Sequence, residues 1–305
     1  MYNYRVFNDQ DYFLRFNSWY QSIILRFHEE RKELKIDHLD DVANEYKKMK
    51  SEFHSILVHA NYIISNLNQL HVLERTIIDQ FEQLRDDMDL QEERIVVYSP
   101  QVIDLLGKIS GALNSISFIQ NRIPRILSKE LKKSLPASLE QFIKGNSDKF
   151  HVENKYFQIV RRYWAKTGKR IKKYRDVEQH HFILTTDVFL ILNPKFKLLI
   201  MLPDNPEVKK QEKLTYEKEY NAMIYMEQSF ENLHSCIEDL AREFGYKPQK
   251  FSASINLDST RDLINKSGTI AALIDNLEFM SGIIFGNDKG RLTLKPFQLI
   301  KNPLR

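Results

Sequence analysis

A chain of 305 residues with 42% hydrophobic and 28% charged content is long enough to bury a substantial core and has the composition of a globular protein. Nine glycines and nine prolines leave few breaks for a many-turned β fold, so the composition favours helices. Basic residues exceed acidic ones by 45 to 41, a mild excess that excludes neither nucleic-acid binding nor an ordinary neutral surface.

The single cysteine, Cys236, excludes an intramolecular disulfide and a cysteine-rich zinc site, as is typical of the reducing cytosol. The first residues lack the apolar core of a signal peptide, and no segment approaches the roughly 20 apolar residues that span a bilayer. We therefore expect a cytoplasmic protein that has no membrane partner and needs neither a metal nor a cofactor.

Two amphipathic helices are predicted early in the chain, over residues 9–34 and 40–78. In both segments apolar residues recur at steps of three and four, which places them on one face of a helix. The second helix carries three histidines whose spacing lacks the close pattern of a metal site, so we expect them to pack or to lie at the surface. These histidines are His54, His59 and His71.

A third helix is predicted to open at Ser99 and Pro100, because a serine cap followed by proline is typical of a helix start. It should continue towards Ile123 and stop before Pro124, with a basic turn around residues 129–133 beyond it.

The clearest internal loop is the Gly-Asn-Ser-Asp sequence at residues 145–148. We interpret it as the boundary between an N-terminal helical region, residues 1–145, and a second helical domain, residues 146–305. The two parts can also pack as one unit.

The second domain is predicted to start with a helix over residues 152–165, a break at residues 167–168 and another helix over residues 169–184. Two short apolar runs then flank an Asn-Pro-Lys turn, which predicts a β-hairpin of residues 188–192 and 196–202.

A long amphipathic helix over residues 215–244, ending at Gly245, should complete a bundle around the helix 169–184. A last helix is predicted over residues 259–284, and an irregular or briefly extended tail follows. The fold is thus predicted to be mainly α, a multi-helix bundle with a small β-hairpin insertion.

The helix 169–184 contains the residues with the clearest chemical potential. Arg175 is always charged and can hold a phosphodiester, while His180 can take a proton from a ribose 2′-hydroxyl or return one to the leaving oxygen. Asp176 lies four residues before His180 and would share its helical face, so it could orient the imidazole and raise its pKa. His181 is the alternative histidine, about 100° further round the helix.

A basic run precedes this pair. Residues 155–175 contain nine lysines and arginines and no acidic residue, and aromatic residues are interleaved with them. Cations beside aromatic planes suit the phosphates and unpaired bases of single-stranded RNA. The candidate RNA-binding residues are Lys166, Lys169, Arg170, Lys172, Lys173 and Tyr174.

The segment from Ile171 to His180 resembles the R-x4-6-H signature of HEPN domains, in which a small polar residue, here Asp176, often follows the arginine. The resemblance covers about residues 150–245. It implies a HEPN-type helical bundle that forms a homodimer, with the motifs meeting across the dimer. It also implies a metal-independent endoribonuclease that acts through 2′-hydroxyl attack and leaves a cyclic phosphate. By family analogy such a protein is a toxin or defence effector with an antitoxin or regulatory partner.

Simpler interpretations compete with this one. Arg175 can pair with a nearby acid, Asp176 can cap a helix start, and His180 can be an ordinary packed histidine. The basic run can be a solvated helix face whose aromatic residues belong to the core. A non-catalytic module that binds RNA, a nucleotide or a protein would also fit the motif.

Two E-x-x-H sequences raise the alternative of a di-metal site, since di-iron bundles use two such elements. They run from Glu178 to His181 and from Glu231 to His234. The hairpin predicted between them leaves little room for the intervening helix that a di-iron bundle needs, so we expect no metal there.

Overall fold

The computed structural model describes residues 39–85, 92–180, 184–185, 187–208 and 210–245, together with three short strands further along the chain. Helices make up 70% of the described residues, and a small antiparallel sheet accompanies them. The prediction of a mainly α chain is therefore confirmed.

The chain divides into two compact units. One comprises residues 43–244, and the other comprises residues 1–42 and 245–305. The loop near residue 145 lies inside the first unit. The predicted helix 9–34 lies outside the described residues, as does all but the end of the predicted helix 259–284.

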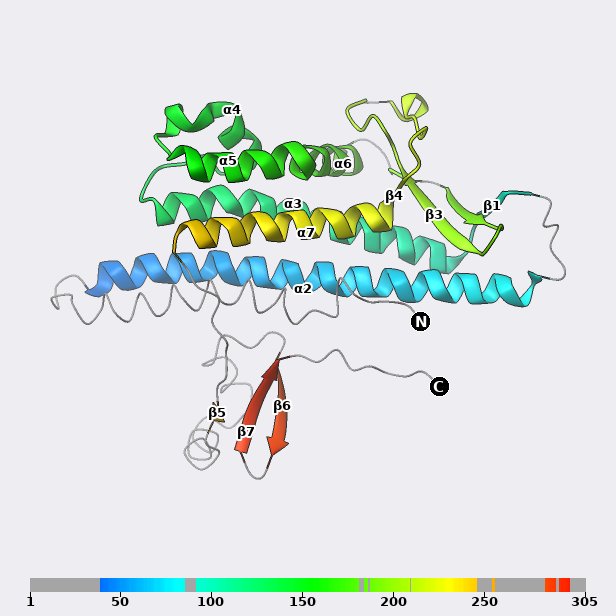
Figure 1. Ribbon diagram of the computed structural model, residues 1–305, viewed down its shortest axis with the longest axis horizontal. Helices are drawn as coiled ribbons and strands as arrows, with labels where there is room; N and C mark the ends of the chain where they lie inside the picture. The colour runs from blue at the N-terminus through cyan, green and yellow to red at the C-terminus, as the bar shows by residue number, and fades with distance from the viewer. Residues whose placement is uncertain are drawn as a thin grey trace. The chain divides into compact units, whose positions relative to one another are not determined.

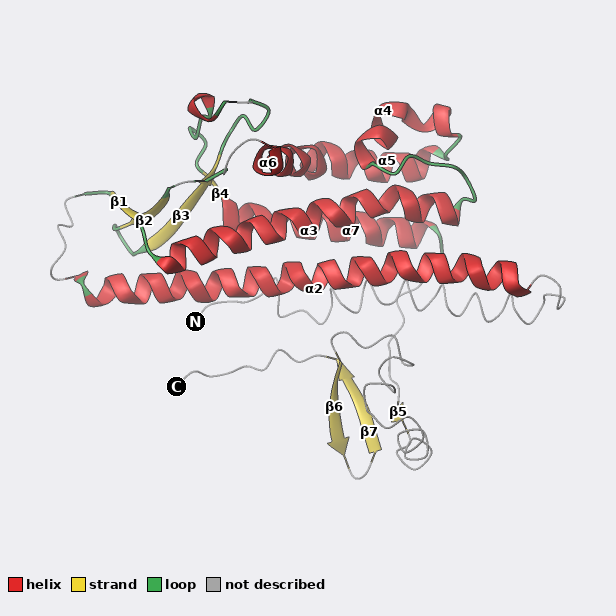
Figure 2. Cartoon of the chain, turned by 180° about the vertical axis from the view of Figure 1, so that it is seen from behind, coloured by secondary structure: helices red, strands yellow, loops and turns green. Residues whose placement is uncertain are grey.

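The first described helix, α2, spans Leu39–Gln83 and confirms the predicted helix 40–78. It runs along α3 (Pro100–Glu130) and α7 (Ala222–Glu243), and Figures 1 and 2 show these two helices between α2 and the helices α5 and α6. Its fully buried side chains recur at steps of three and four, which gives one continuous core face. They include Phe53, Ile56, Ala60, Ile63, Leu67 and Leu70.

A histidine clamp joins α2 to α7. The Nε2 atom of His71 lies 2.6 Å from Oε1 of Glu227 on α7, and its Nδ1 atom lies 3.6 Å from Oε2 of Glu74 on α2. The hydrogen bonds to Glu227 and then to Glu74 raise the pKa of His71 to about 9, although burial opposes them. The imidazole is therefore charged at neutral pH, and this charge ties the two helices together.

Helix α3 begins as predicted but ends later. The Ser99 hydroxyl accepts a hydrogen bond from the Val102 amide, and Pro100 occupies the first turn. The predicted end before Pro124 is wrong, because the helix continues through this buried proline to Glu130. Ile126 and other buried residues beyond it pack into the core, which offsets the missing backbone hydrogen bond. By length and composition alone α3 could cross a membrane, but its apolar face packs inside the bundle.

The region of the predicted loop 145–148 is helical on both sides of a kink. Helix α4 spans Leu139–Phe150, and Ser138 caps its start by accepting a hydrogen bond from the Gln141 amide. Asn146, with φ 58° and ψ 176°, interrupts it, so a local break exists where the sequence predicted one.

The predicted break at residues 167–168 is wrong. Helix α5 (Asn154–Tyr163), a π-helical turn (Trp164–Gly168) and α6 (Lys169–His180) follow one another without leaving helical geometry. Gly168 serves close packing here, since a Cβ atom would lie 2.9 Å from Cε1 of Tyr163. The Asn232 amide donates to the Thr167 hydroxyl at 2.8 Å and fixes the wide turn against α7.

Four strands form an antiparallel sheet in the order β1 (Arg94–Val97), β2 (Val188–Ile191), β3 (Lys197–Leu202) and β4 (Tyr220–Asn221). Strands β2 and β3 confirm the predicted hairpin. Sequence reasoning missed β1, because four residues are too few to show an alternating pattern. The sheet lies at one end of the bundle (Figure 2), and α7 packs against β3 and β4.

The predicted helix 215–244 is shorter than expected. Helix α7 begins only at Ala222, because Asn221 caps it by accepting hydrogen bonds from the Met223 and Ile224 amides. The residues just before the cap pair with β3 as β4. Gly245, with φ 78°, follows the helix end as predicted.

In the second unit the described residues form a three-stranded antiparallel sheet. Its order is β5 (Ser254–Ile255), β7 (Arg291–Pro296) and β6 (Ile283–Asp288). The expectation of a briefly extended tail is thus confirmed for the described residues, and residues 283–284, assigned to the last helix, are in a strand.

Candidate functional site

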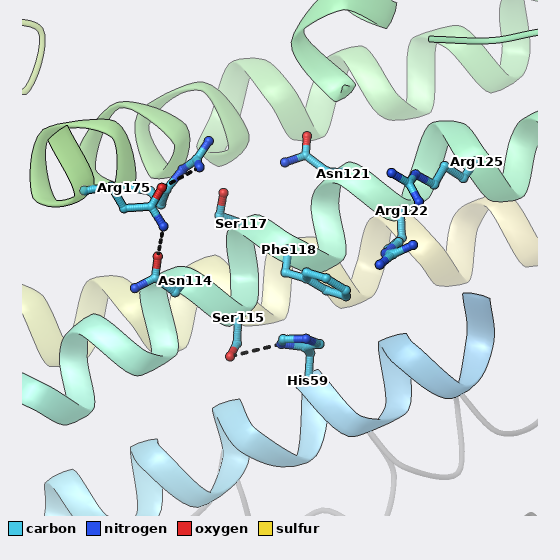
Figure 3. A pocket seen from close by; sticks show the side chains of 10 residues that line it. His59, Asn114, Ser115, Ser117, Phe118, Asn121, Arg122, Arg125 and Arg175 are labelled. Atoms are coloured by element: carbon cyan, nitrogen blue, oxygen red, sulfur yellow. Dashed lines mark hydrogen bonds between the residues drawn. The ribbon is translucent and has the colours of Figure 1, made fainter. Parts of the chain in front are cut away.

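A polar pocket of about 350 Å³ lies between α2, α3 and α6. Figure 3 shows Arg175 reaching in from α6, with Arg122 and Arg125 on α3 on the other side. Ten residues line it, and none of them is acidic. They are His59, Asn114, Ser115, Ser117, Phe118, Asn121, Arg122, Arg125, Arg175 and Gln179.

Helix α3 supplies most of this lining. Asn114, Ser117, Asn121 and Arg125 lie at steps of three and four, so they form a polar stripe beside the apolar face that packs into the core. Helical periodicity therefore gathers amides, a hydroxyl and a guanidinium on the side of α3 that faces the pocket.

The arginines of α3 share one carboxylate. Nη1 of Arg122 lies 2.8 Å from Oε2 of Glu52, while Arg125 Nη1 and Lys129 Nζ lie 3.8 Å and 3.6 Å from Oε1. One acid among three cations leaves net positive charge at this side of the pocket. Each guanidinium has five N–H donors, so donors remain for a ligand.

Arg175 is positioned by its own helix and by α3. Its Nη1 atom donates to Gln179 Oε1 at 2.7 Å, and Gln179 in turn donates to Asn114 Oδ1 at 3.0 Å. Its Nη2 atom lies 3.0 Å from Oδ1 of Asp176. The Nε atom is buried and has no hydrogen-bond partner among the described residues. Burial and these bonds hold the guanidinium at the pocket.

His59 on α2 faces the same pocket. Its ring stacks on Phe118 with centroids 3.7 Å apart, and Arg122 lies over that phenyl ring at 4.3 Å. Its Nδ1 atom is 3.3 Å from the Ser115 hydroxyl. Burial, and then the charge of Arg122, lower the pKa of His59 below its usual value of 6.5. The imidazole is therefore neutral at pH 7. We expected His59 to pack or to lie at the surface, and the structure shows that it also lines a pocket together with three arginines.

The two motif residues do not meet at this pocket. Arg175 and His180 are five residues apart in a regular helix, so their side chains point about 140° apart. His180 is exposed at the last residue of α6, while Arg175 lines the pocket. The alternative histidine, His181, lies outside the described residues.

Asp176 forms ordinary ion pairs within α6. Its carboxylate contacts Lys172 and Arg175. It lies inside a continuous helix, so it caps no helix start. Of the simpler interpretations, the pairing of Arg175 with a nearby acid is thus observed.

The aromatic residues of the basic run belong to the core. Tyr174 has no exposed surface, and its hydroxyl donates to the Pro203 carbonyl at 2.8 Å, so its assignment as an RNA-stacking residue is wrong. The sequence could not show which side of α6 would pack inside. The other aromatic residues of the run are buried as well, namely Tyr156, Phe157, Tyr163 and Trp164.

The cations of the run divide into two groups. Arg170 donates to the carbonyl of Asp204 at 2.8 Å and lies over Tyr220 at 4.3 Å, and Lys172 bridges Asp176 and Glu140. These two positions stabilise the fold. Three other candidates lie at the surface or partly exposed, namely Lys166, Lys169 and Lys173.

Sequence reasoning missed His59, Arg122 and Arg125. The sequence signal for the two arginines is the polar stripe along α3, in which Asn114, Ser117, Asn121 and Arg125 recur at steps of three and four. Their meeting with Arg175 depends on how α2, α3 and α6 pack, which no local pattern reveals. Among the described residues no group of three or more metal-ligating side chains is present.

No family model, curated protein or solved structure matches the chain. The resemblance to HEPN domains therefore stays a prediction from the Arg175 motif.

Proposed function

We propose that the protein binds single-stranded RNA and seats a phosphate between Arg122, Arg125 and Arg175. One observation carries this proposal: three arginines from two helices converge on a pocket with no acidic lining residue. Planar guanidinium groups match the geometry and charge of a phosphate better than any other side chain does.

The other lining residues support a nucleotide over a bare anion. Asn114, Asn121 and Gln179 carry amides that can bond to a ribose or a base edge. The volume of about 350 Å³ falls in the range of about 300–1,000 Å³ typical of small-ligand sites, which is enough for about one nucleotide. Exposed Lys166 and Lys169 would add attraction for the remaining phosphates.

RNA binding is tested by equilibrium titration of a labelled single-stranded RNA. Replacing Arg122 or Arg175 with alanine should weaken binding about 10- to 100-fold, because each loses charge-assisted hydrogen bonds of about 1.5–3 kcal/mol. Arg161→Ala is the matched control, since this arginine is exposed in the basic run and lies outside the pocket. Folded pocket variants that bind like the wild type would exclude this site.

A second candidate function is a HEPN-type, metal-independent endoribonuclease in the cytoplasm, active as a homodimer. The exposed position of His180, turned about 140° from Arg175 on the same helix, favours it, because each histidine could then serve the arginine of the partner subunit. A toxin or defence role with a regulatory partner would follow from that activity.

Mixing two inactive variants tests the dimer. Arg175→Ala and His180→Ala proteins should each be inactive, and a refolded mixture should recover part of the activity through heterodimers with one intact site. A mixture that stays inactive while both variants dimerise would contradict sharing of the site. A mixture without dimers would contradict the assembly itself.

A further inference from the structure

The pocket holds one group that exchanges a proton near neutral pH. Among its ten lining residues only His59 is titratable in that range, since the three arginines stay charged and the rest are neutral or apolar. His59 belongs to α2, outside the motif on α6. His59 lines the same pocket as the three arginines, whereas His180 does not line it.

We propose that His59 is the proton acceptor for cleavage of RNA bound in this pocket, so that one subunit carries a complete site. The inference rests on the proposed RNA binding, and it replaces His180 with His59 as the catalytic histidine. The arginines provide the phosphate site, and the histidine provides the proton transfer that they cannot supply.

The ring of His59 is held in a fixed orientation. It stacks on Phe118 at 3.7 Å, and its Nδ1 atom lies 3.3 Å from the Ser115 hydroxyl. In the tautomer whose Nδ1–H donates to Ser115, Nε2 carries the lone pair that accepts a proton. Ser115 would then act as a positioning residue, since it selects that tautomer.

The surroundings favour the neutral form that a base needs. Burial and the charge of Arg122 lower the pKa of His59, so most molecules carry an unprotonated imidazole at pH 7. Once protonated beside Arg122, the same imidazolium is a stronger acid than an ordinary histidine and gives its proton up readily.

The reaction balances without a metal or an outside reagent. His59 takes the proton of the 2′-hydroxyl, the 2′-oxygen forms a bond to phosphorus, and the bond from phosphorus to the 5′-oxygen breaks. The imidazolium then returns the proton to the departing 5′-oxygen. The products are a 2′,3′-cyclic phosphate and a 5′-hydroxyl, and Arg125 and Arg175 would stabilise the negative charge that builds on the phosphate oxygens.

The test uses the full chain, a labelled single-stranded RNA and EDTA. We expect His59→Gln to bind RNA within about twofold of the wild type and to cleave it about 10²–10⁴-fold more slowly. His151→Asn, which changes an exposed histidine outside the pocket, should cleave at the wild-type rate. An RNA with 2′-deoxyribose throughout should bind without being cut.

The pH profile separates a chemical role of His59 from a structural one. Wild-type cleavage should rise with pH through a value below 6.5 and then level off, and the glutamine variant should lack this rise. If His59→Gln fails to fold, Ser115→Ala should still bind RNA and cleave more slowly, and an unchanged rate in that variant would overturn the proposal.

Other outcomes are equally decisive. Wild-type protein that binds RNA without cutting it would overturn the role of His59 and leave the RNA-binding function standing. Cleavage that depends on His180 and survives His59→Gln would also overturn it. Wild-type protein that binds no RNA would instead remove the proposed function itself.

Discussion

The histidine clamp between α2 and α7 should make the stability of the protein depend on pH in a defined window. His71 has a folded pKa of about 9 against an unfolded value of 6.5. At about 1.36 kcal/mol per pKa unit this difference corresponds to roughly 3 kcal/mol of stabilisation when the histidine is charged. Because the folded pKa is the raised one, the stabilisation is complete below pH 6.5 and is lost as pH rises towards 9.

The His71→Gln variant measures this contribution, because glutamine can still hydrogen-bond but never carries the charge. Urea unfolding at a series of pH values should show the wild type more stable than the variant by roughly 3 kcal/mol at pH 6. The difference should shrink to about 1 kcal/mol or less by pH 9.5. A gap of the same size at both pH values would refute the reasoning, since it would show that packing, and not charge, holds His71 against Glu227.

Three further predictions concern packing, the basic run and the pocket. Gly168→Ala should lower the free energy of unfolding by about 1–3 kcal/mol, because the added Cβ atom would clash with an aromatic ring. Gly107 has open space around its Cα atom, so Gly107→Ala should raise the free energy of unfolding by about 0.5–1 kcal/mol in the same urea titrations. Tyr174→Phe should cost about 1–2 kcal/mol through the lost hydrogen bond to Pro203 and leave RNA affinity unchanged; weaker RNA binding by the folded variant would contradict its place in the core. Glu52→Gln should strengthen RNA binding several-fold at low salt, because it removes the carboxylate that competes with an RNA phosphate for Arg122 and Arg125. Weaker RNA binding by this variant would argue against a phosphate in the pocket.

Sequence patterns predicted the parts of the fold that local chemistry determines. The steps of three and four from Phe53 to Leu70 gave α2, and Ser99 with Pro100 located the start of α3. Pro124 and Gly168 led to wrong predictions of a helix end and a helix break, because tertiary packing outweighs their local effect. Helix α3 continues beyond Pro124 because the residues after it are buried in the core, and Gly168 leaves space for two aromatic rings.

The candidate site was only partly predictable. Arg175 was identified from its motif, and it does face a pocket. The residues that meet it, His59, Arg122 and Arg125, are 50 or more positions away in sequence, so their convergence is a property of helix packing. Tyr174 shows the converse, because a residue in a basic run looked like a surface residue until the buried side of α6 was known.

The salt dependence of RNA binding tests the central claim most directly. Each phosphate contact to single-stranded RNA contributes about 0.7 to the slope of log affinity against log salt. Because the three arginines hold one phosphate, replacing Arg122, Arg125 and Arg175 together with glutamine should lower the slope by about 0.7 and weaken binding at every salt concentration. Arg161→Gln should change neither by a comparable amount. A folded triple variant that keeps the wild-type slope and affinity would show that RNA phosphates do not bind in this pocket.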